Sequence, residues 1–132
     1  MKIVNAKPYF PPDDIDPILN DIKESLKTGM LTFGPNVSKL EKEFSEYTGV
    51  KYAIAVNSGT SALEIALRFY DLAGGEVIVP TNSFVASANA VILAGGKPVF
   101  VDIKKETLCI NPEDVRKKIT SKTKGIMVVH LA

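Results

Sequence analysis

Short apolar runs alternate with helix-like segments through the second half of the chain. The apolar runs are rich in valine and isoleucine and lie at 52–56, 76–80, 98–103 and 125–130. Segments with a helical pattern lie between them, at 60–71, 84–94 and 112–119. Strands that are apolar along their whole length are typical of parallel sheets with helices on both faces. The sequence therefore predicts an α/β fold with a mostly parallel sheet.

Residues 1–50 carry a different pattern, which is helical throughout. Apolar side chains recur at i, i+3, i+4 and i+7 in 13–28, and they share one face in 37–47. We therefore expect an N-terminal helical segment over 1–50 and an α/β part over 51–132. Polar and glycine residues mark the helix ends. The predicted caps are Asp13 or Asp14 and Gly29 for the first helix, Asn36 and Gly49 for the second, and Asn111, followed by Pro112, for the segment at 112–119.

The turn Ser58-Gly59-Thr60-Ser61 joins the apolar run at 52–56 to the helix at 60–71. A glycine allows the backbone to approach a ligand closely, and the free N–H groups and dipole of a helix start favour an anion. Hydroxyl groups add further donors, so a phosphate is the expected ligand. The structural alternative is a simple helix cap, and the turn taken alone favours that alternative.

The composition excludes several classes of protein. The chain has 132 residues, of which 16 are basic and 15 acidic, for a net charge of +1. This balance gives no electrostatic basis for binding nucleic acid or an anionic membrane. Cys109 is the single cysteine, which is typical of a reducing compartment, and no segment reaches membrane-spanning length. We expect a soluble cytoplasmic protein, and no metal site is predicted.

Two features indicate that this α/β unit needs further cover. The helix at 60–71 is apolar on almost all sides, and only Glu64 and Arg68 interrupt it, at a spacing that allows them to pair. Such a helix requires another domain or a partner subunit against it. The run at 125–130 reads as a core strand with no covering element after it. We therefore expect that the chain is an N-terminal part of a longer protein and that its sheet is incomplete at the C-terminus.

Five blocks of residues stand in order along the chain. They are Leu31-Thr32-Phe33-Gly34-Pro35 followed by Leu40-Glu41 and Phe44, then Ala55 to Leu63, Glu76 to Ala90, Gly95 to Ile103, and Val128 to Ala132. Any one of these blocks alone is a weak signal, and the ordered set is a strong one. The set resembles the N-terminal third of the sugar aminotransferases of the DegT/DnrJ/EryC1/StrS family.

The resemblance implies the three-layer large domain of pyridoxal-phosphate enzymes with the aspartate-aminotransferase fold. It assigns the turn of Ser58, Gly59, Thr60 and Ser61 to the cofactor phosphate, with the N–H groups of Thr60 and Ser61 as donors. It assigns Phe84 to stacking on the pyridine ring. It further implies that Ser87 and Asn89 support the cofactor site and that Gly34 faces the substrate.

Each of these assignments has a structural alternative. An aromatic residue at a helix start, such as Phe84, is more often part of a core than a cofactor platform. His130 reads as a core histidine and Asp102 as a turn or cap, and neither receives a catalytic role. The ordered blocks favour the cofactor interpretation for Thr60, Ser61 and Phe84 only.

The family chemistry transfers an amino group from an amino-acid donor to a nucleotide-linked keto-sugar, in a homodimer. The lysine that forms a Schiff base with the cofactor, and the carboxylate that pairs with its pyridine nitrogen, lie beyond this stretch in the family. We therefore expect no catalytic residue in the chain, and neither transamination nor strong cofactor binding by the chain alone. Three alternatives stay open: a sugar dehydratase of the same family, a free-standing phosphate- or nucleotide-binding α/β module, and a non-catalytic remnant.

Overall fold

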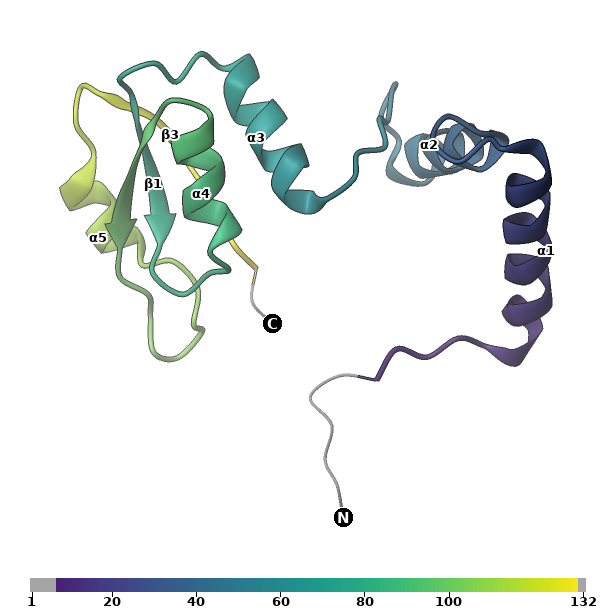
Figure 1. The fold of residues 1–132 in the computed structure, drawn as a ribbon. Helices are drawn as coiled ribbons and strands as arrows, with labels where there is room; N and C mark the ends of the chain where they lie inside the picture. Colours follow the sequence, from purple (N-terminus) through teal and green to yellow (C-terminus); the bar gives the residue numbers. More distant parts are fainter. Residues whose placement is uncertain (1–6, 131–132) are drawn as a thin grey trace. The chain divides into compact units, whose positions relative to one another are not determined.

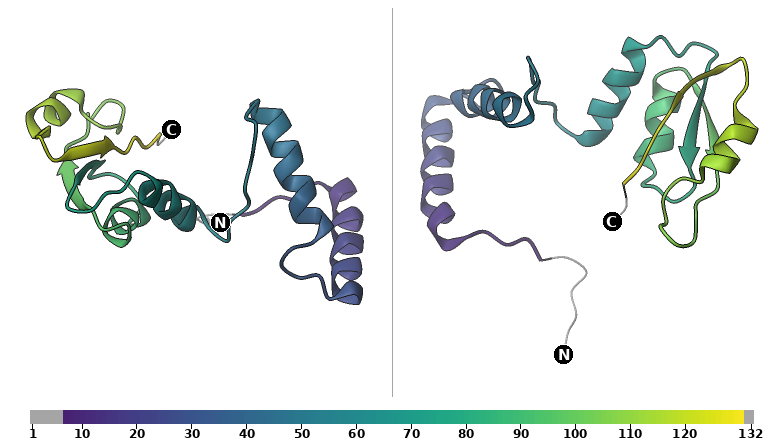
Figure 2. Two further views of the ribbon diagram at one scale, coloured as in Figure 1. Left: turned by 90° about the horizontal axis from the view of Figure 1, so that it is seen from above. Right: turned by 180° about the vertical axis from the view of Figure 1, so that it is seen from behind.

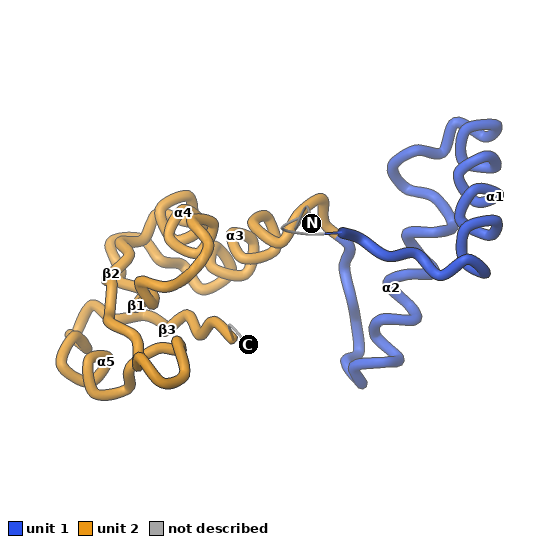
Figure 3. Tube along the Cα trace, turned by 90° about the horizontal axis from the view of Figure 1, so that it is seen from below, with its two compact units in different colours: residues 1–55 blue, residues 56–132 orange. Residues whose placement is uncertain are grey.

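A computed structural model describes residues 7–130 of the chain. It separates into two compact units, residues 1–55 and residues 56–132 (Figure 3). Among the described residues, the first unit contains two helices, and the second contains three helices and a three-stranded sheet. The α/β pattern of the sequence therefore corresponds to the second unit.

Helices α1 and α2 of the first unit span Pro12–Thr28 and Pro35–Thr48. Both helices end at the predicted glycine in the left-handed conformation, with φ of 69° at Gly29 and 73° at Gly49. Glycine suits this position because a Cβ would be strained there. The C-terminal ends of both helices are thus set by local sequence.

The predicted N-caps of these two helices are wrong. Neither Asp13 nor Asp14 caps α1, which Pro11 precedes, and Gly34 rather than Asn36 precedes α2. No side chain makes a cap hydrogen bond at either start. Each helix begins with a proline, whose fixed φ suits the first turn and whose missing N–H needs no acceptor.

The apolar faces of α1 and α2 are present as predicted, but neither helix has a buried residue. An open groove of about 560 Å³ lies between the two helices and the loop that joins them. Its apolar lining includes Ile18, Ile22, Leu26, Leu31 and Leu40. Within the first unit, therefore, these side chains are not fully removed from water.

The predicted strand at 52–56 is not a strand in the structure. Tyr52 is 74% exposed and Ile54 is 82% exposed. The N–H of Ala55 donates a 2.8 Å hydrogen bond to a carboxylate oxygen of Glu41 and not to a neighbouring strand. A strand exists only when its backbone groups pair with another strand, and no described segment pairs with 52–56.

The sheet of the second unit is parallel, in the order β2-β1-β3 (Figure 1). Its strands span Glu76–Pro80 (β1), Lys97–Val101 (β2) and Thr123–Ile126 (β3). Strand β1 is central, and its residues Val77, Ile78 and Val79 are at most 1% exposed. The predicted parallel sheet is confirmed.

Helices cover both faces of this sheet, as Figure 2 shows. They are α3 (Gly59–Phe69), α4 (Ala86–Leu93) and α5 (Pro112–Lys118). Because side chains alternate along a strand, Val77 and Val79 of β1 pack with Val91 of α4, whereas Ile78 packs with Val115 of α5. The result is the expected three-layer arrangement.

Several predicted bounds in this unit need correction. The run at 98–103 forms a strand only to Val101, and the helix predicted from 84 begins at Ala86. The run at 125–130 forms a strand only to Ile126, although the N–H of Met127 still donates to the carbonyl of Ile78 at 2.8 Å. Strand β1 ends at Pro80, which pairs with Val101, so residues 102–103 have no partner on it. The predicted block also includes residues 131–132, which lie outside the described residues.

The predicted pairing on α3 is present. Arg68 Nε donates a 2.8 Å hydrogen bond to the carboxylate of Glu64, and Arg68 Nη2 donates to the carbonyl of Leu93 at 2.6 Å. This second contact ties α3 to the C-terminal end of α4. Even so, no residue of α3 is buried, and Phe69 is 84% exposed. The expectation that another domain or subunit covers α3 stays a prediction.

Asp114 ties α5 to the end of β2. Its Oδ2 accepts hydrogen bonds from the N–H of Asp102 at 2.8 Å and from Lys118 Nζ, which lies 3.2 Å away. The backbone N–H of Asp102 and the ammonium of Lys118 hold the pKa of the Asp114 carboxyl below its ordinary value. The predicted cap Asn111 is confirmed, because its side chain accepts from the N–H of Glu113 at 3.1 Å.

Gly96→Ala is expected to destabilise the protein by overpacking its core. A Cβ at this position would lie 3.2 Å from both Leu72 Cβ and Val91 Cγ1. Overpacking of this kind costs about 1–3 kcal/mol. Urea denaturation measures the loss. Gly125→Ala is the control, because its Cβ would meet no atom within 4 Å. Equal stability of the two variants would contradict the assigned core.

Asp114→Asn is expected to lower the urea midpoint at neutral pH. The folded-state pKa of Asp114 is lowered, so the stabilisation is present above the ordinary pKa of an aspartate. This stabilisation is lost as the pH falls through the folded-state pKa of Asp114. The urea midpoints of the unsubstituted and Asp114→Asn proteins should therefore become equal in acid. Glu113→Gln, in the same helical turn, controls for the helix dipole and should change the midpoint less. A difference that persists in acid would contradict the assignment.

Candidate functional site

The predicted cofactor residues of the second unit gather at one end of its sheet. In Figure 1, the carboxyl end of β1 and the N-termini of α3 and α4 point to the same end. Ligands of open α/β sheets bind outside the carboxyl ends of the strands. The turn before α3 and the loop before α4 are thus at the edge where such a site is expected.

Ser58 caps helix α3. Its φ of −162° and ψ of 157° are extended, and its Oγ accepts a 3.1 Å hydrogen bond from the N–H of Ser61. The Ser58 hydroxyl also donates to Ser61 Oγ at 3.1 Å. The structural alternative raised from the sequence is therefore present: this turn is a helix cap. The cap engages the N–H of Ser61, one of the two predicted phosphate donors.

The cap leaves other donors at the same helix start. Among the described residues, the N–H groups of Gly59 and Thr60 have no acceptor. These groups carry the positive end of the helix dipole. The N–H of Thr60 was predicted as a phosphate donor, whereas the N–H of Gly59 was not. The Gly59 donor could have been inferred from the sequence, because Gly59 follows the cap residue Ser58 and the first N–H groups of a helix have no acceptor within it.

The space around Gly59 tests whether a phosphate fits this helix start. A Cβ built on Gly59 would meet no protein atom within 4 Å, and Gly59 lies in ordinary helical backbone. A larger residue would therefore fit at position 59, because no protein atom lies close and the φ of Gly59 is one that any residue can adopt. Open space beside unpaired N–H groups is what an anion needs, so the residues present fit the phosphate of a cofactor.

Phe84 lies in the loop between β1 and α4, one residue before the N-cap Val85. Its side chain is 76% exposed. The alternative of a core phenylalanine does not hold within the described residues. An exposed aromatic ring at the ligand end of the sheet is suited to stacking on a flat heterocycle.

Ser87 and Asn89 differ in their surroundings. Ser87 is 6% exposed, and its hydroxyl lies 2.5 Å from Ser83 Oγ. Asn89 is exposed on α4, and no described residue makes a hydrogen bond with its side chain. Ser83 was not singled out from the sequence. The spacing of two serines at i and i+4 around Phe84 is the signal that could have identified it.

Gly34 lies in the first unit, where it precedes α2 and lines the groove between α1 and α2. A Cβ here would lie 3.2 Å from the carbonyl oxygen of Met30. The close approach of this carbonyl accounts for a glycine at position 34. The role of Gly34 toward a substrate stays a prediction.

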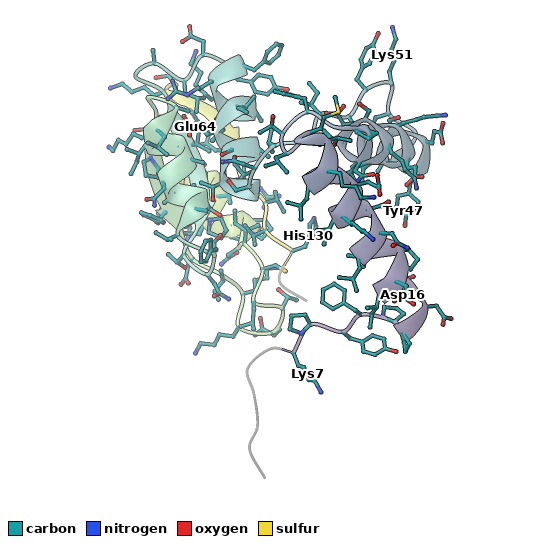
Figure 4. The ribbon with its side chains drawn as sticks, turned by 45° about the vertical axis from the view of Figure 1, so that its right-hand side comes forward. Lys7, Asp16, Tyr47, Lys51, Glu64 and His130 are labelled. Carbon is teal, nitrogen blue, oxygen red and sulfur yellow. The ribbon has the colours of Figure 1, made fainter. Side chains whose placement is uncertain are left out.

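The residues that received no role are placed as follows. His130 is exposed (Figure 4), Cys109 is half-buried, and Asp102 Oδ1 accepts a 2.8 Å hydrogen bond from the N–H of Ile103. Within residues 7–130, no three His, Cys, Asp or Glu side chains are grouped to hold a metal ion. No helix in that range is both long and apolar enough to cross a membrane.

The chain is similar to several known proteins. A Bacillus subtilis (strain 168) protein, 3-oxo-glucose-6-phosphate:glutamate aminotransferase, is 46% identical over 120 residues, which are 90% of this chain and 27% of the relative. The structure of NtdA from Bacillus subtilis with bound cofactor PMP is 40% identical with a TM-score of 0.80, and the match covers 98% of this chain and 32% of that one. A GDP-4-keto-6-deoxymannose-3-dehydratase structure is 30% identical with a TM-score of 0.73, over 83% of this chain and 30% of that one.

The chain thus spans 27% of the length of the curated relative and 32% of the NtdA chain. Residues 12–132 match the sequence profile of the DegT/DnrJ/EryC1/StrS aminotransferase family, whose members depend on pyridoxal phosphate. This match extends over both units of the structure and nearly all described residues. The chain belongs to the DegT/DnrJ/EryC1/StrS aminotransferase family.

Proposed function

We propose that this chain provides the phosphate turn and the ring-stacking residue of a pyridoxal-phosphate-dependent sugar aminotransferase. The observation that carries the proposal is the pair of unpaired N–H groups at Gly59 and Thr60, which adjoin open space at the start of α3. Family membership supplies the identity of the anion. A free-standing nucleotide-binding module does not account for that membership.

The turn before α3 holds the cofactor phosphate. The N–H groups of Gly59 and Thr60 donate to phosphate oxygens, and the hydroxyl groups of Ser58 and Ser61 are close enough to each other to share in this contact. The dipole of α3 adds a favourable interaction with the negative charge. These contacts orient the cofactor at the carboxyl end of β1.

Phe84 stacks on the pyridine ring. When bound, pyridoxal phosphate supplies an electron-poor ring that stabilises negative charge on the carbon that loses its proton. Phe84 holds the pyridine ring in one orientation and excludes water from the face on which it stacks. The lysine that bonds to the cofactor and the carboxylate at its pyridine nitrogen are proposed to lie outside residues 7–130.

The substrate is proposed to be a keto-sugar that carries phosphate. The name of the Bacillus subtilis relative pairs a keto-sugar phosphate with glutamate, and the name of the dehydratase contains a keto-sugar linked to GDP. Both are consistent with a phosphorylated keto-sugar, of which a nucleotide-linked form is one case. Glutamate is proposed as the amino donor. The protein is further proposed to act as a homodimer in the cytoplasm. Gly34 is proposed to face the substrate.

Dehydration is the second candidate, supported by the dehydratase structure at 30% identity. Amino transfer is preferred because the relative named as an aminotransferase is 46% identical. The residues of this chain that contact the cofactor serve both reactions equally. The choice therefore depends on which product forms.

The proposed reaction is tested with the full protein, pyridoxal phosphate, glutamate and 3-oxo-glucose-6-phosphate. We expect one 2-oxoglutarate for each amino sugar formed, and mass spectrometry measures both. A second reaction with a nucleotide-linked keto-sugar decides between the two substrate forms. A dehydrated sugar without 2-oxoglutarate would support the dehydratase, and no product of either kind would contradict the proposed activity.

Gly59→Pro is expected to weaken binding of the cofactor phosphate. Proline is favourable at the first helical position, and the extended backbone of Ser58 tolerates a following proline. The substitution removes one N–H donor to a charged group, a contact of about 1.5–3 kcal/mol, so Kd should rise about 10- to 100-fold. Calorimetry with pyridoxamine phosphate measures this change.

Two comparisons isolate the contribution of the donor. Gly59→Ala adds a methyl group but keeps the N–H. It therefore distinguishes the steric effect of added atoms from the loss of the hydrogen-bond donor. Pyridoxamine, which lacks the phosphate, should bind the unsubstituted and Gly59→Pro proteins alike. If Gly59→Pro weakened both ligands equally, the turn would not be the phosphate site.

A further inference from the structure

A pair of serine hydroxyls spans the exposed residue Phe84. Ser83 Oγ lies 2.5 Å from Ser87 Oγ, so one hydroxyl donates to the other. Ser83 belongs to the loop before α4, whereas Ser87 belongs to the first turn of that helix. Among the described residues, this is the one side-chain to side-chain hydrogen bond between this loop and α4.

The backbone on both sides of Phe84 is held by further bonds. The N–H of Ser87 donates to the carbonyl of Phe84 at 3.0 Å, and the N–H of Thr81 donates to the carbonyl of Val101 at 3.0 Å. The N-cap residue of α4 makes no side-chain cap bond. The serine pair therefore links the loop to the first turn of α4 through side chains, in the absence of a cap bond.

Burial separates the roles of Ser87 and Phe84. Ser87 is 6% exposed, and its hydroxyl is already paired, whereas Phe84 is 76% exposed. A buried, paired hydroxyl is poorly placed to contact a ligand that the exposed ring contacts. A loop that is ordered in advance loses less conformational freedom when a ring stacks on it.

We propose that Ser83 and Ser87 are positioning residues, which hold Phe84 in place for the cofactor ring. This inference rests on the proposed function, because it requires Phe84 to stack on that ring. It assigns Ser87 to an indirect role instead of the direct cofactor contact predicted from the sequence. It also adds Ser83 to the site.

The test uses the double variant Ser83→Ala/Ser87→Ala in the full protein. Replacing both partners leaves no buried hydroxyl unpaired, so folding should be nearly unchanged. Binding of pyridoxamine phosphate is measured by calorimetry, because this form lacks the aldehyde and cannot bond to a lysine. The double variant should bind about 2- to 10-fold more weakly, the equivalent of one neutral hydrogen bond.

The same double substitution is then made in a Phe84→Ala background. There it should leave Kd unchanged, because no ring remains to be positioned. Ser83→Thr keeps the hydroxyl and should bind like the unsubstituted protein. The positioning role is overturned if the double substitution leaves Kd unchanged in the protein that retains Phe84, or if it weakens binding equally with Phe84 and with Phe84→Ala.

The outcomes separate this inference from the proposed function. If the unsubstituted protein binds no pyridoxamine phosphate, or if Phe84→Ala alone has no effect, stacking by Phe84 is overturned and the positioning role with it. If Phe84→Ala weakens binding but the serine substitutions do not, only the positioning role is overturned. Weakening by the serine pair that depends on Phe84 supports both.

Discussion

The parallel pairing of β1 between β2 and β3 is the constraint on which the second unit depends. Val77 and Val79 of β1 face α4, and Ile78 faces α5, so one strand joins the two apolar clusters. Parallel neighbours require crossover connections, which return the chain to the same edge of the sheet. The loop that follows β1 therefore opens at the carboxyl edge, where α3 also begins (Figure 1).

The candidate site combines a structural and a functional role in one turn. Ser58 caps α3 by accepting from the N–H of Ser61, yet the N–H groups of Gly59 and Thr60 keep no acceptor within the described residues. A helix start has more donors than one cap can engage. Capping and anion binding are thus compatible at this turn, and the two interpretations of its sequence are not exclusive.

The sequence predicted the core strands and the helix ends where local chemistry decides them. Strand β1 has the predicted bounds because it is apolar and has partners on both sides, and Gly29 and Gly49 end their helices because they adopt positive φ. The run at 52–56 looks equally strand-like but has no partner among the described residues. Residue pattern reports strand propensity, whereas pairing decides whether a strand forms.

The sequence alone determined the order of the elements from α3 onward, the glycine-hydroxyl turn at Ser58 to Ser61 and the aromatic residue Phe84, because each depends on residue type and spacing. Only the tertiary structure decided that Ser87 is buried against Ser83 while Phe84 is exposed. It also decided which donors of the turn stay free. The reason is physical: burial and hydrogen-bond partners arise from which surfaces meet, and a linear pattern does not specify them.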